Sequence, residues 1–383
     1  MKQRNLIGAC ALACVLAFGM SGASAGTPSD PLAQAQDLVT TAPGVTVSVY
    51  ASGLNNPRGL KFSIGDRLVV AEGGTGGTQS TAGQCDQIGP PIGPYTGSAT
   101  GGRISRVLTF GDPGIRRRAT WFGNLPSSQT SPDSGSLVSG VADIAFVDGT
   151  LYALISGAGC SHGVASRDNA VVRLVPGQAP VLVANLSKWL KAHPGTALGP
   201  DVETDGTWYS MVAFNGGLYI VEPNNGLFIR VNPRTGVISR ILDVSAAVGF
   251  HIVPTALARH KGYFYIANLG TFPIVDGSQH VWRVLSDPPR LQEVARGTAI
   301  LGLAFDRNDA MYILQMTSGS PEPAPGMGSI VRIRPGGGPQ TIVSGLTLPT
   351  AMTMGPDGDL YVSHIGFGPP IPGAGQVLRV HLP

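Results

Sequence analysis

The sequence predicts an all-β protein, a six-bladed β-propeller whose last blade is closed by a strand from the N-terminal part of the chain. Three observations point to this fold: the composition, a motif that recurs six times, and an alternating segment near the start of the chain. Of the 383 residues, 54 are Gly and 31 are Pro, while 43% are hydrophobic and only 13% are charged. Many turns between short apolar segments are typical of all-β folds, and so large an apolar share excludes disorder.

The beginning of the chain has the pattern of a secretory signal peptide. Lys2 and Arg4 supply a positive start, residues 6–20 are apolar, and small residues precede a cleavage point between Ala25 and Gly26. The apolar stretch is short for a transmembrane helix, and no later segment reaches the ~18 apolar residues that one needs. We therefore expect a secreted or periplasmic protein with no transmembrane segment in the mature chain.

The predicted signal peptide and propeller divide the chain into a signal peptide at 1–25, a linker at 26–44 and the propeller at 45–383. A lipid anchor at Cys14 is the less favoured alternative, because the residues before it match a lipobox poorly.

Charge and cysteine content limit the partners and the chemistry. Removal of Lys2 and Arg4 lowers the net charge from +3 to +1, which gives no support to nucleic-acid binding. Cys85 and Cys160 remain, and we expect them to form a disulfide in an oxidising compartment. A free Cys160 acting as a nucleophile beside His162 is the weaker alternative.

A unit of about 50 residues recurs six times, as in ring-shaped repeat folds. An arginine in a strand-like context marks each unit: Arg106, Arg173, Arg230, Arg283, Arg332 and Arg379. An apolar strand, a turn and a second strand precede it, and the second strand often carries Leu-Tyr, as at residues 151–152, 218–219 and 360–361. One unit cannot bury its apolar faces alone, so the units must stack around an axis.

The ends of the chain indicate how the ring closes. The last unit, ending at residues 376–382, is one strand short, whereas residues 45–50 alternate between apolar and polar side chains as a half-buried strand does. We expect the second segment to complete the last blade. Residues 73–100, 112–139 and 161–207 exceed the repeat, and the last of these should hold a short helix capped by Ser187.

The hairpins place the start of each inner strand and the end of the next strand on one face. Candidate ligand-binding residues at these positions are Arg58, Asp143, Asn224, Asn268 and His364. Candidate catalytic residues on the same face are Glu72, Glu222 and His251. Carboxylate and amide oxygens that converge on an axis could hold Ca²⁺. The alternative is that they cap strand ends and line a polar channel.

No known catalytic signature is present in the sequence. Residues 201–206, Asp-Val-Glu-Thr-Asp-Gly, resemble the start of a calcium loop, but Val212 stands where the twelfth-position Glu would be. A turn is therefore favoured. The zinc motif His-Glu-x-x-His and the nucleophile motif Gly-x-Ser-x-Gly are both missing.

Several stretches resemble the ScyD/ScyE family of exported bacterial proteins. They are residues 53–60, 93–97, 157–163, 205–212, 268–273 and 366–370. This resemblance implies a secreted or periplasmic propeller, and the family name does not settle an activity. More distantly, the architecture is similar to NHL-type and gluconolactonase-like propellers, which hold a central metal. That similarity implies Glu72, Glu222 and Asn268 as metal ligands.

Two functions follow from these observations. The first is a binding or accessory protein that presents its loop-rich axial face to a small molecule, a glycan or a protein. The alternative is a calcium-dependent hydrolase or lactonase in which Glu222 or Glu72 acts as a base. The first is favoured, because no pair of residues identifies a reaction.

Overall fold

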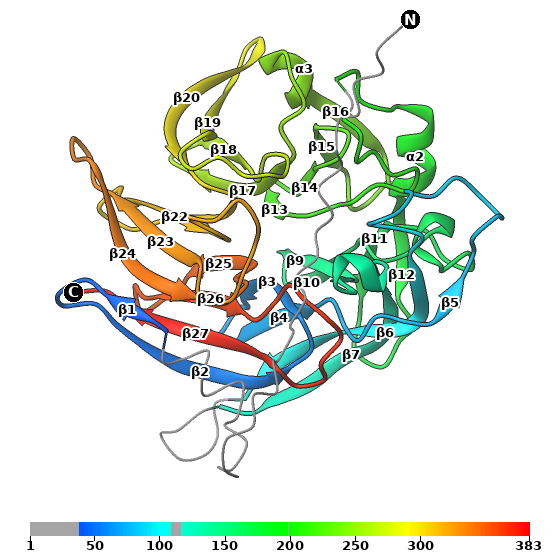
Figure 1. Cartoon of the computed structure of the whole chain (residues 1–383), viewed down its shortest axis with the longest axis horizontal. Helices are drawn as coiled ribbons and strands as arrows, with labels where there is room; N and C mark the ends of the chain where they lie inside the picture. Colours follow the sequence, from blue (N-terminus) through cyan, green and yellow to red (C-terminus); the bar gives the residue numbers. More distant parts are fainter. Residues whose placement is uncertain (1–37, 109–115, 198) are drawn as a thin grey trace, which may run out of the picture.

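The structure, a computed structural model, describes residues 38–108, 116–197 and 199–383. The predicted signal peptide lies outside these residues. Six antiparallel sheets form a ring of six blades around a central axis (Figure 1), which confirms the predicted propeller. In each blade the strands follow one another in sequence order from the axis to the rim, except that the N-terminal strands β1 and β2 form the outer edges of two blades.

The first three blades are built as follows. Blade 1 contains β3 (Pro57–Phe62), β4 (Leu68–Glu72), β6 (Thr96–Val107) and β7 (Arg118–Gln129), with β5 (Gln79–Ser80) and β8 (Val138–Ser139) at its edges. Blade 2 contains β9 (Val141–Val147), β10 (Thr150–Ile155), β11 (Ala170–Leu174) and β12 (Val181–Asn185). Blade 3 contains β13 (Met211–Phe214), β14 (Gly217–Glu222), β15 (Leu227–Val231) and β16 (Ile238–Asp243).

The last three blades repeat the pattern. Blade 4 contains β17 (Pro254–His260), β18 (Tyr263–Asn268), β19 (Gln279–Ser286) and β20 (Pro289–Gly297). Blade 5 contains β21 (Ile300–Phe305), β22 (Met311–Gln315), β23 (Gly328–Ile333), β24 (Pro339–Leu346) and β1 (Thr40–Thr41). Blade 6 contains β25 (Ala351–Met354), β26 (Leu360–His364), β27 (Gly375–His381) and β2 (Thr46–Leu54).

The N-terminal strand β2 closes the ring, as the alternating segment predicts. It lies antiparallel to β27, with Val47 opposite Val380 and Val49 opposite Leu378. Upstream of it, β1 pairs with β24 in the neighbouring blade. The N-terminal part of the described chain is therefore bonded to two blades, and its first contact falls within the segment expected to be a linker.

The core consists of apolar layers between neighbouring blades. Val69 and Ile104 of blade 1 pack with Ile144 and Leu151 of blade 2, for example, and all four side chains are buried. Each sheet carries apolar residues on both faces, because a neighbouring blade covers each of those faces. Every fully buried Leu or Ile contributes roughly 1.5–3 kcal/mol of hydrophobic free energy.

The repeated arginine lies directly opposite the tyrosine of the second strand in five blades. These pairs are Tyr152 and Arg173, Tyr219 and Arg230, Tyr265 and Arg283, Tyr312 and Arg332, and Tyr361 and Arg379. In blade 1, Val69 stands opposite Arg106. Because opposite residues on one face of a sheet are in contact range, blade 1 differs from the other five at this position.

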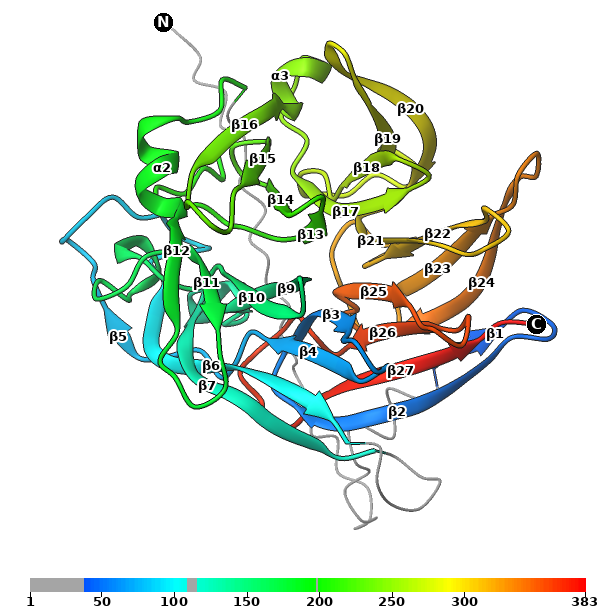
Figure 2. The same cartoon turned by 180° about the vertical axis from the view of Figure 1, so that it is seen from behind.

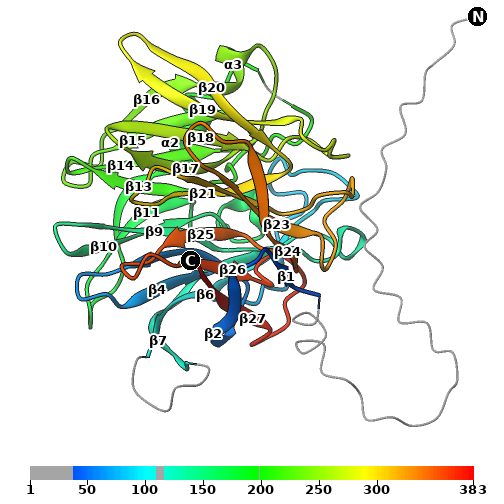
Figure 3. The same ribbon diagram turned by 90° about the vertical axis from the view of Figure 1, so that its left-hand side faces the viewer.

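The long insertions gather on one face of the ring, and the turns between first and second strands point to the other (Figure 3). The predicted disulfide between Cys85 and Cys160 is confirmed, and it joins the insertions of blades 1 and 2. The predicted short helix is α2 (Leu186–Ala192), and a second short helix is α3 (Val244–Val248). The residue that caps α2 is Asn185 and not Ser187, because the side-chain oxygen of Asn185 accepts the N–H of Lys188 at 2.8 Å.

No helix among the described residues combines the length and the apolar character needed to cross a membrane.

Candidate ligand-binding site

A cavity of about 170 Å³ lies on the axis of the propeller. All six blades line it, because the inner strands β3, β9, β13, β17, β21 and β25 surround the axis (Figure 2). Most of its lining is Gly, Ala, Leu, Met and Thr. Its charged residues are Arg58 and Lys61 from β3 and Asp143 from β9, and its aromatic residues are Trp208, Tyr209 and Phe367. The structure thus brings two of the predicted ligand-binding residues, Arg58 and Asp143, to the same cavity.

Arg58 is the charged group of the cavity that has no carboxylate partner. The residue is only 8% exposed, and its Nη2 donates a hydrogen bond to the carbonyl oxygen of Val138. Its guanidinium carbon lies 5.4 Å from the centre of the Phe367 ring. No ion pair joins Arg58 to a carboxylate within residues 38–108, 116–197 and 199–383. Burial lowers the pKa of Arg58, and the same burial raises the pKa of the neighbouring Tyr209 to about 12.

Asp143, by contrast, is fully engaged. Its carboxylate lies 2.9 and 3.1 Å from Nζ of Lys61 and accepts the N–H groups of Ile144 and Met211, each at 2.8 Å. Because Asp143 neutralises Lys61, the net positive charge of the cavity is that of Arg58.

Residues at the ends of second strands, four of them predicted site residues, hold the loops that lead to the inner strands. In five blades the last residue of the second strand makes this contact: Glu72, Glu222, Asn268, Gln315 and His364. Four of them accept a backbone N–H from that loop: Glu72 from Asn55 at 2.5 Å, Glu222 from Thr207 at 2.9 Å, Gln315 from Thr298 at 2.7 Å and His364 from Thr347 at 2.8 Å. The remaining residue, Asn268, is instead a donor: its Nδ2 donates to the carbonyl oxygen of Ile252 at 2.9 Å.

The remaining polar atoms of these residues are also engaged. Glu72 forms an ion pair of 2.7 Å with Arg103 and accepts a hydrogen bond from the hydroxyl of Ser105. Oδ1 of Asn268 accepts the N–H of His280 at 2.7 Å. None of the three residues predicted as metal ligands, Glu72, Glu222 and Asn268, lines the axial cavity.

Two other predicted residues lie beside the acidic segment 201–206. Nδ2 of Asn224 donates to the carbonyl oxygen of Asp201, and Nε2 of His251 lies 2.8 Å from Oδ1 of the same residue. The structure therefore brings Asn224 and His251 together at Asp201, outside the axial cavity.

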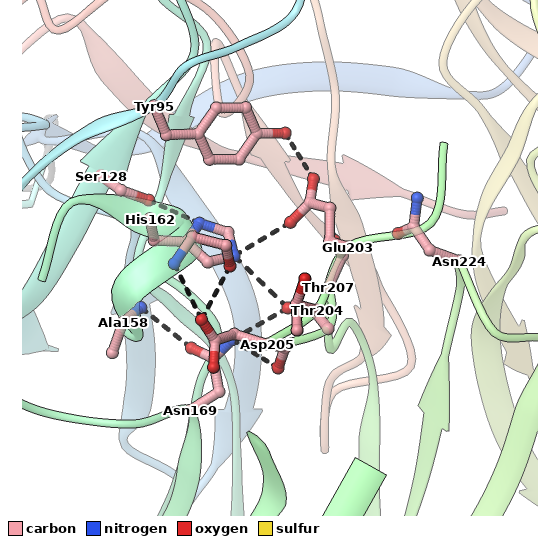
Figure 4. Close-up of polar contacts among 12 residues, drawn as sticks. Tyr95, Ser128, Ala158, His162, Asn169, Glu203, Thr204, Asp205, Thr207 and Asn224 are labelled. Atoms are coloured by element: carbon pink, nitrogen blue, oxygen red, sulfur yellow. Dashed lines mark hydrogen bonds and ion pairs between the residues drawn. The ribbon is translucent and has the colours of Figure 1, made fainter. Parts of the chain in front are cut away.

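The three carboxylates of this segment each contact a different part of the molecule, and Figure 4 shows two of them, Glu203 and Asp205. Asp201 pairs with His251. Glu203 accepts the Tyr95 hydroxyl at 2.5 Å and lies 3.0 Å from Nε2 of His162. Asp205 binds Ser161 and Lys191. Each carboxylate of the segment is therefore bound by side chains of the protein itself.

The described residues contain no group of three or more His, Cys, Asp or Glu side chains that could hold a metal ion. The segment 201–206 instead connects the insertions of blades 1 and 2 to helix α2 and to the loop that precedes β17.

Burial and nearby charge shift the pKa values of several groups in this region, among them Glu222 and His162. Burial raises the pKa of Glu222 to about 7; the N–H groups of Thr207 and Asn225 oppose this, whereas the carboxylates of Glu203 and Asp201 add to it. Because Glu222 is fully buried outside the cavity, a ligand on the axis does not reach it.

The second group is His162. Its burial alone would lower its pKa, but the Glu203 carboxylate favours the protonated form, and the pKa of His162 is raised. Its ring is completely buried, and Nδ1 lies 3.1 Å from the Ser128 hydroxyl (Figure 4). Cys160 is bonded to Cys85, so the alternative of a Cys160 nucleophile beside His162 is wrong.

The sequence did not single out Lys61, Tyr209 and Phe367 as cavity residues. Tyr209 stands two residues before its inner strand, at the position of Ser139 in blade 2, and aligning the repeats on their inner strands could have found it. Phe367 lies in a loop of ordinary length, which gives no signal in the repeat.

The molecule is thus a six-bladed β-propeller with an axial cavity. No model of a known protein family matches the chain, and no curated protein matches it in sequence. Among solved structures it is similar to a protein from Thermus thermophilus named as a putative oxidoreductase of the glucose dehydrogenase type. The identity is 18%, the match covers 88% of this chain and 100% of that one, and the TM-score is 0.51.

Two further structures are similar to the same extent. A protein of unknown function from Bacteroides thetaiotaomicron has 10% identity, coverage of 88% and 76%, and a TM-score of 0.52. A luciferin-regenerating enzyme has 10% identity, coverage of 88% and 96%, and a TM-score of 0.50. At these identities the likeness shows the fold alone.

Proposed function

We propose that this propeller is a binding or accessory protein that takes up a small organic anion in its axial cavity. The observation that carries the proposal is Arg58, a buried guanidinium that faces the cavity and has no carboxylate partner among the described residues. A buried charge is costly unless it is paired. A carboxylate ligand would supply the missing charge and would accept hydrogen bonds from the planar guanidinium.

The size and lining of the cavity restrict the ligand. A volume of about 170 Å³ corresponds to about six water molecules at ~30 Å³ each. A carboxylate with a short, partly apolar body fits this volume and the Leu, Met and Phe side chains around it.

The resemblance to the ScyD/ScyE family implies an exported propeller and favours neither function. The disulfide supports export, because disulfides persist in oxidising compartments. The calcium-dependent hydrolase has less support, since the predicted metal ligands are already hydrogen-bonded within the protein and lie outside the cavity.

Calorimetric titration with lactate, pyruvate and gluconate, and with glycerol as a neutral probe, tests the proposal. We expect at least one carboxylate to bind and its affinity to fall at least tenfold in Arg58→Gln, because a hydrogen bond to a charged group contributes about 1.5–3 kcal/mol. Arg240→Gln is the matched control: Arg240 donates to backbone carbonyls on an exposed loop. Equal affinity in wild type and Arg58→Gln would contradict the proposal.

A further inference from the structure

A second cavity lies between blades 1 and 2, on the face opposite the insertions. Its volume is about 480 Å³. The turn between β3 and β4, the outer strands of blade 1 and the hairpin turns of blade 2 line it. One wall is apolar and includes Phe146, Leu151, Leu174 and Pro176, and the other carries Arg67, Arg106 and Trp121. We call it the interblade groove.

The irregularity of blade 1 creates the cationic wall. In the other five blades a tyrosine stands opposite the repeated arginine, whereas Val69 stands opposite Arg106. The guanidinium of Arg106 instead stacks on the indole of Trp121, with its central carbon 3.3 Å from the ring centre. A guanidinium that stacks on a ring keeps its N–H groups in the guanidinium plane, where they can donate hydrogen bonds to a ligand.

The two arginines of the groove have no counter-charge there. In the described parts of the chain, neither the Arg67 nor the Arg106 side chain forms an ion pair or a hydrogen bond, and no acidic residue lines the groove. Asp148, next to the lining residue Gly149, lies 3.7 Å from Arg234. Burial lowers the pKa of Arg106, and the charge of Arg67 lowers it further. Two like charges therefore lie close together, and an anion between them would relieve their repulsion.

We propose that the interblade groove binds an organic carboxylate with an apolar body. The guanidinium of Arg106 would bind the carboxylate, in the planar geometry that suits two parallel hydrogen bonds, and Arg67 would add charge. The Phe146 side of the groove would cover the aliphatic or aromatic body of the ligand. A free inorganic anion would leave that wall exposed to water, and a neutral apolar molecule would leave the arginines uncompensated.

The volume supports a small ligand of this kind, because sites for small molecules typically measure about 300–1,000 Å³. The groove shares no lining residue with the axial cavity. The proposal for the groove and the proposal for the axial cavity can therefore be tested independently.

Titration with octanoate tests the proposal, followed by calorimetry and by tryptophan fluorescence. We expect saturable binding of octanoate, at least tenfold weaker binding of both octanol and inorganic phosphate, and a decrease in octanoate affinity with rising salt. Arg106→Gln should lower the affinity at least tenfold, and Arg67→Gln should lower it by a smaller factor. Trp121→Phe should preserve binding and remove the fluorescence response.

The matched control is Arg173→Gln, which removes the same charge at the same repeat position in blade 2. Arg173 is exposed and does not line the groove, so octanoate affinity should stay within a factor of two of wild type. Arg58→Gln should leave it unchanged as well, which separates this site from the axial cavity. If Arg106→Gln fails to fold, the affinity of Arg67→Gln for octanoate and the salt dependence of octanoate binding test the proposal in its place.

Several results would overturn the proposal. These are the absence of saturable octanoate binding, equal affinity in wild type and both arginine variants, and equal affinity for octanoate and phosphate. Binding of an acidic peptide without binding of octanoate would also overturn it.

Discussion

Nζ of Lys61 lies 2.9 Å from Oδ1 of Asp143, so an ion pair joins the inner strands of blades 1 and 2 at the axial cavity. The other carboxylate oxygen of Asp143 accepts the N–H of Met211, the first residue of the inner strand of blade 3. One side chain therefore connects three consecutive blades at the axis.

Replacing Asp143 by Ala should destabilise the fold. The change leaves the N–H of Met211 without its acceptor and Lys61, which is 30% exposed, without its partner. We expect a loss of about 2 kcal/mol in the free energy of unfolding, less than the ~3–5 kcal/mol for a fully buried pair because solvent reaches Lys61. Urea denaturation measures it. Asp148→Ala, which removes an exposed carboxylate 3.7 Å from Arg234, should change stability by less than about 0.5 kcal/mol; equal losses would contradict the role of Asp143.

The disulfide should contribute strongly to stability. It closes a loop of 75 residues between Cys85 and Cys160, and the chain-entropy model assigns about 4 kcal/mol to a loop of that length. The double variant Cys85→Ser/Cys160→Ser should unfold at correspondingly lower urea concentration. Reductant should shift the wild type toward the variant and leave the variant unchanged. Mass spectrometry that found two free thiols in the oxidised mature protein would refute the pairing.

Glu222 and His364 should make opposite contributions to the pH dependence of stability. The pKa of Glu222 is raised by burial from 4.5 to about 7, so its contribution is full below about pH 4.5 and is lost as the pH rises to 7. The pKa of His364 is lowered by burial from 6.5 to about 4. Its contribution is therefore full above pH 6.5 and is lost as the pH falls to 4. Each difference corresponds to roughly 3 kcal/mol.

Two variants separate these contributions. Relative to wild type, Glu222→Gln should gain stability as the pH rises from 4.5 to 7, whereas His364→Gln should gain it as the pH falls from 6.5 to 4. Denaturation at four or five pH values gives both curves. Difference curves with the same slope in both variants would show that the two groups do not titrate as described.

Asn268 distinguishes a structural hydrogen bond from a calcium ligand. Asn268→Asp keeps the oxygen that accepts the N–H of His280 but replaces the donor to the carbonyl oxygen of Ile252 with a second oxygen. We expect a loss of about 1–3 kcal/mol that Ca²⁺ does not restore. Asn308→Asp, on an exposed turn, is the control and should be near neutral. If Ca²⁺ stabilised wild type and stabilised Asn268→Asp still more, the metal hypothesis would be correct after all.

The candidate site was only partly predictable from the sequence. Repeat spacing correctly placed Glu72, Asn268 and His364 at the ends of second strands, but spacing cannot tell whether a polar atom turns to the axis or to a nearby backbone. The nearest hydrogen-bond partner decides this, within about 3 Å, and that partner lies on a loop 16 or 17 residues upstream. Similarly, the regular spacing of the six arginines gave no sign that Arg106 stacks on Trp121.

By itself, the sequence determined that this is a ring of six blades, closed by a strand from near the start of the chain. Those features follow from periodicity and from the alternation of apolar residues, which are properties of short segments. The tertiary structure alone decided which polar side chains face the axial cavity, because that cavity exists only where all six inner strands meet. It also decided that the interblade groove forms, since its two walls come from different blades and face each other only when those blades pack together.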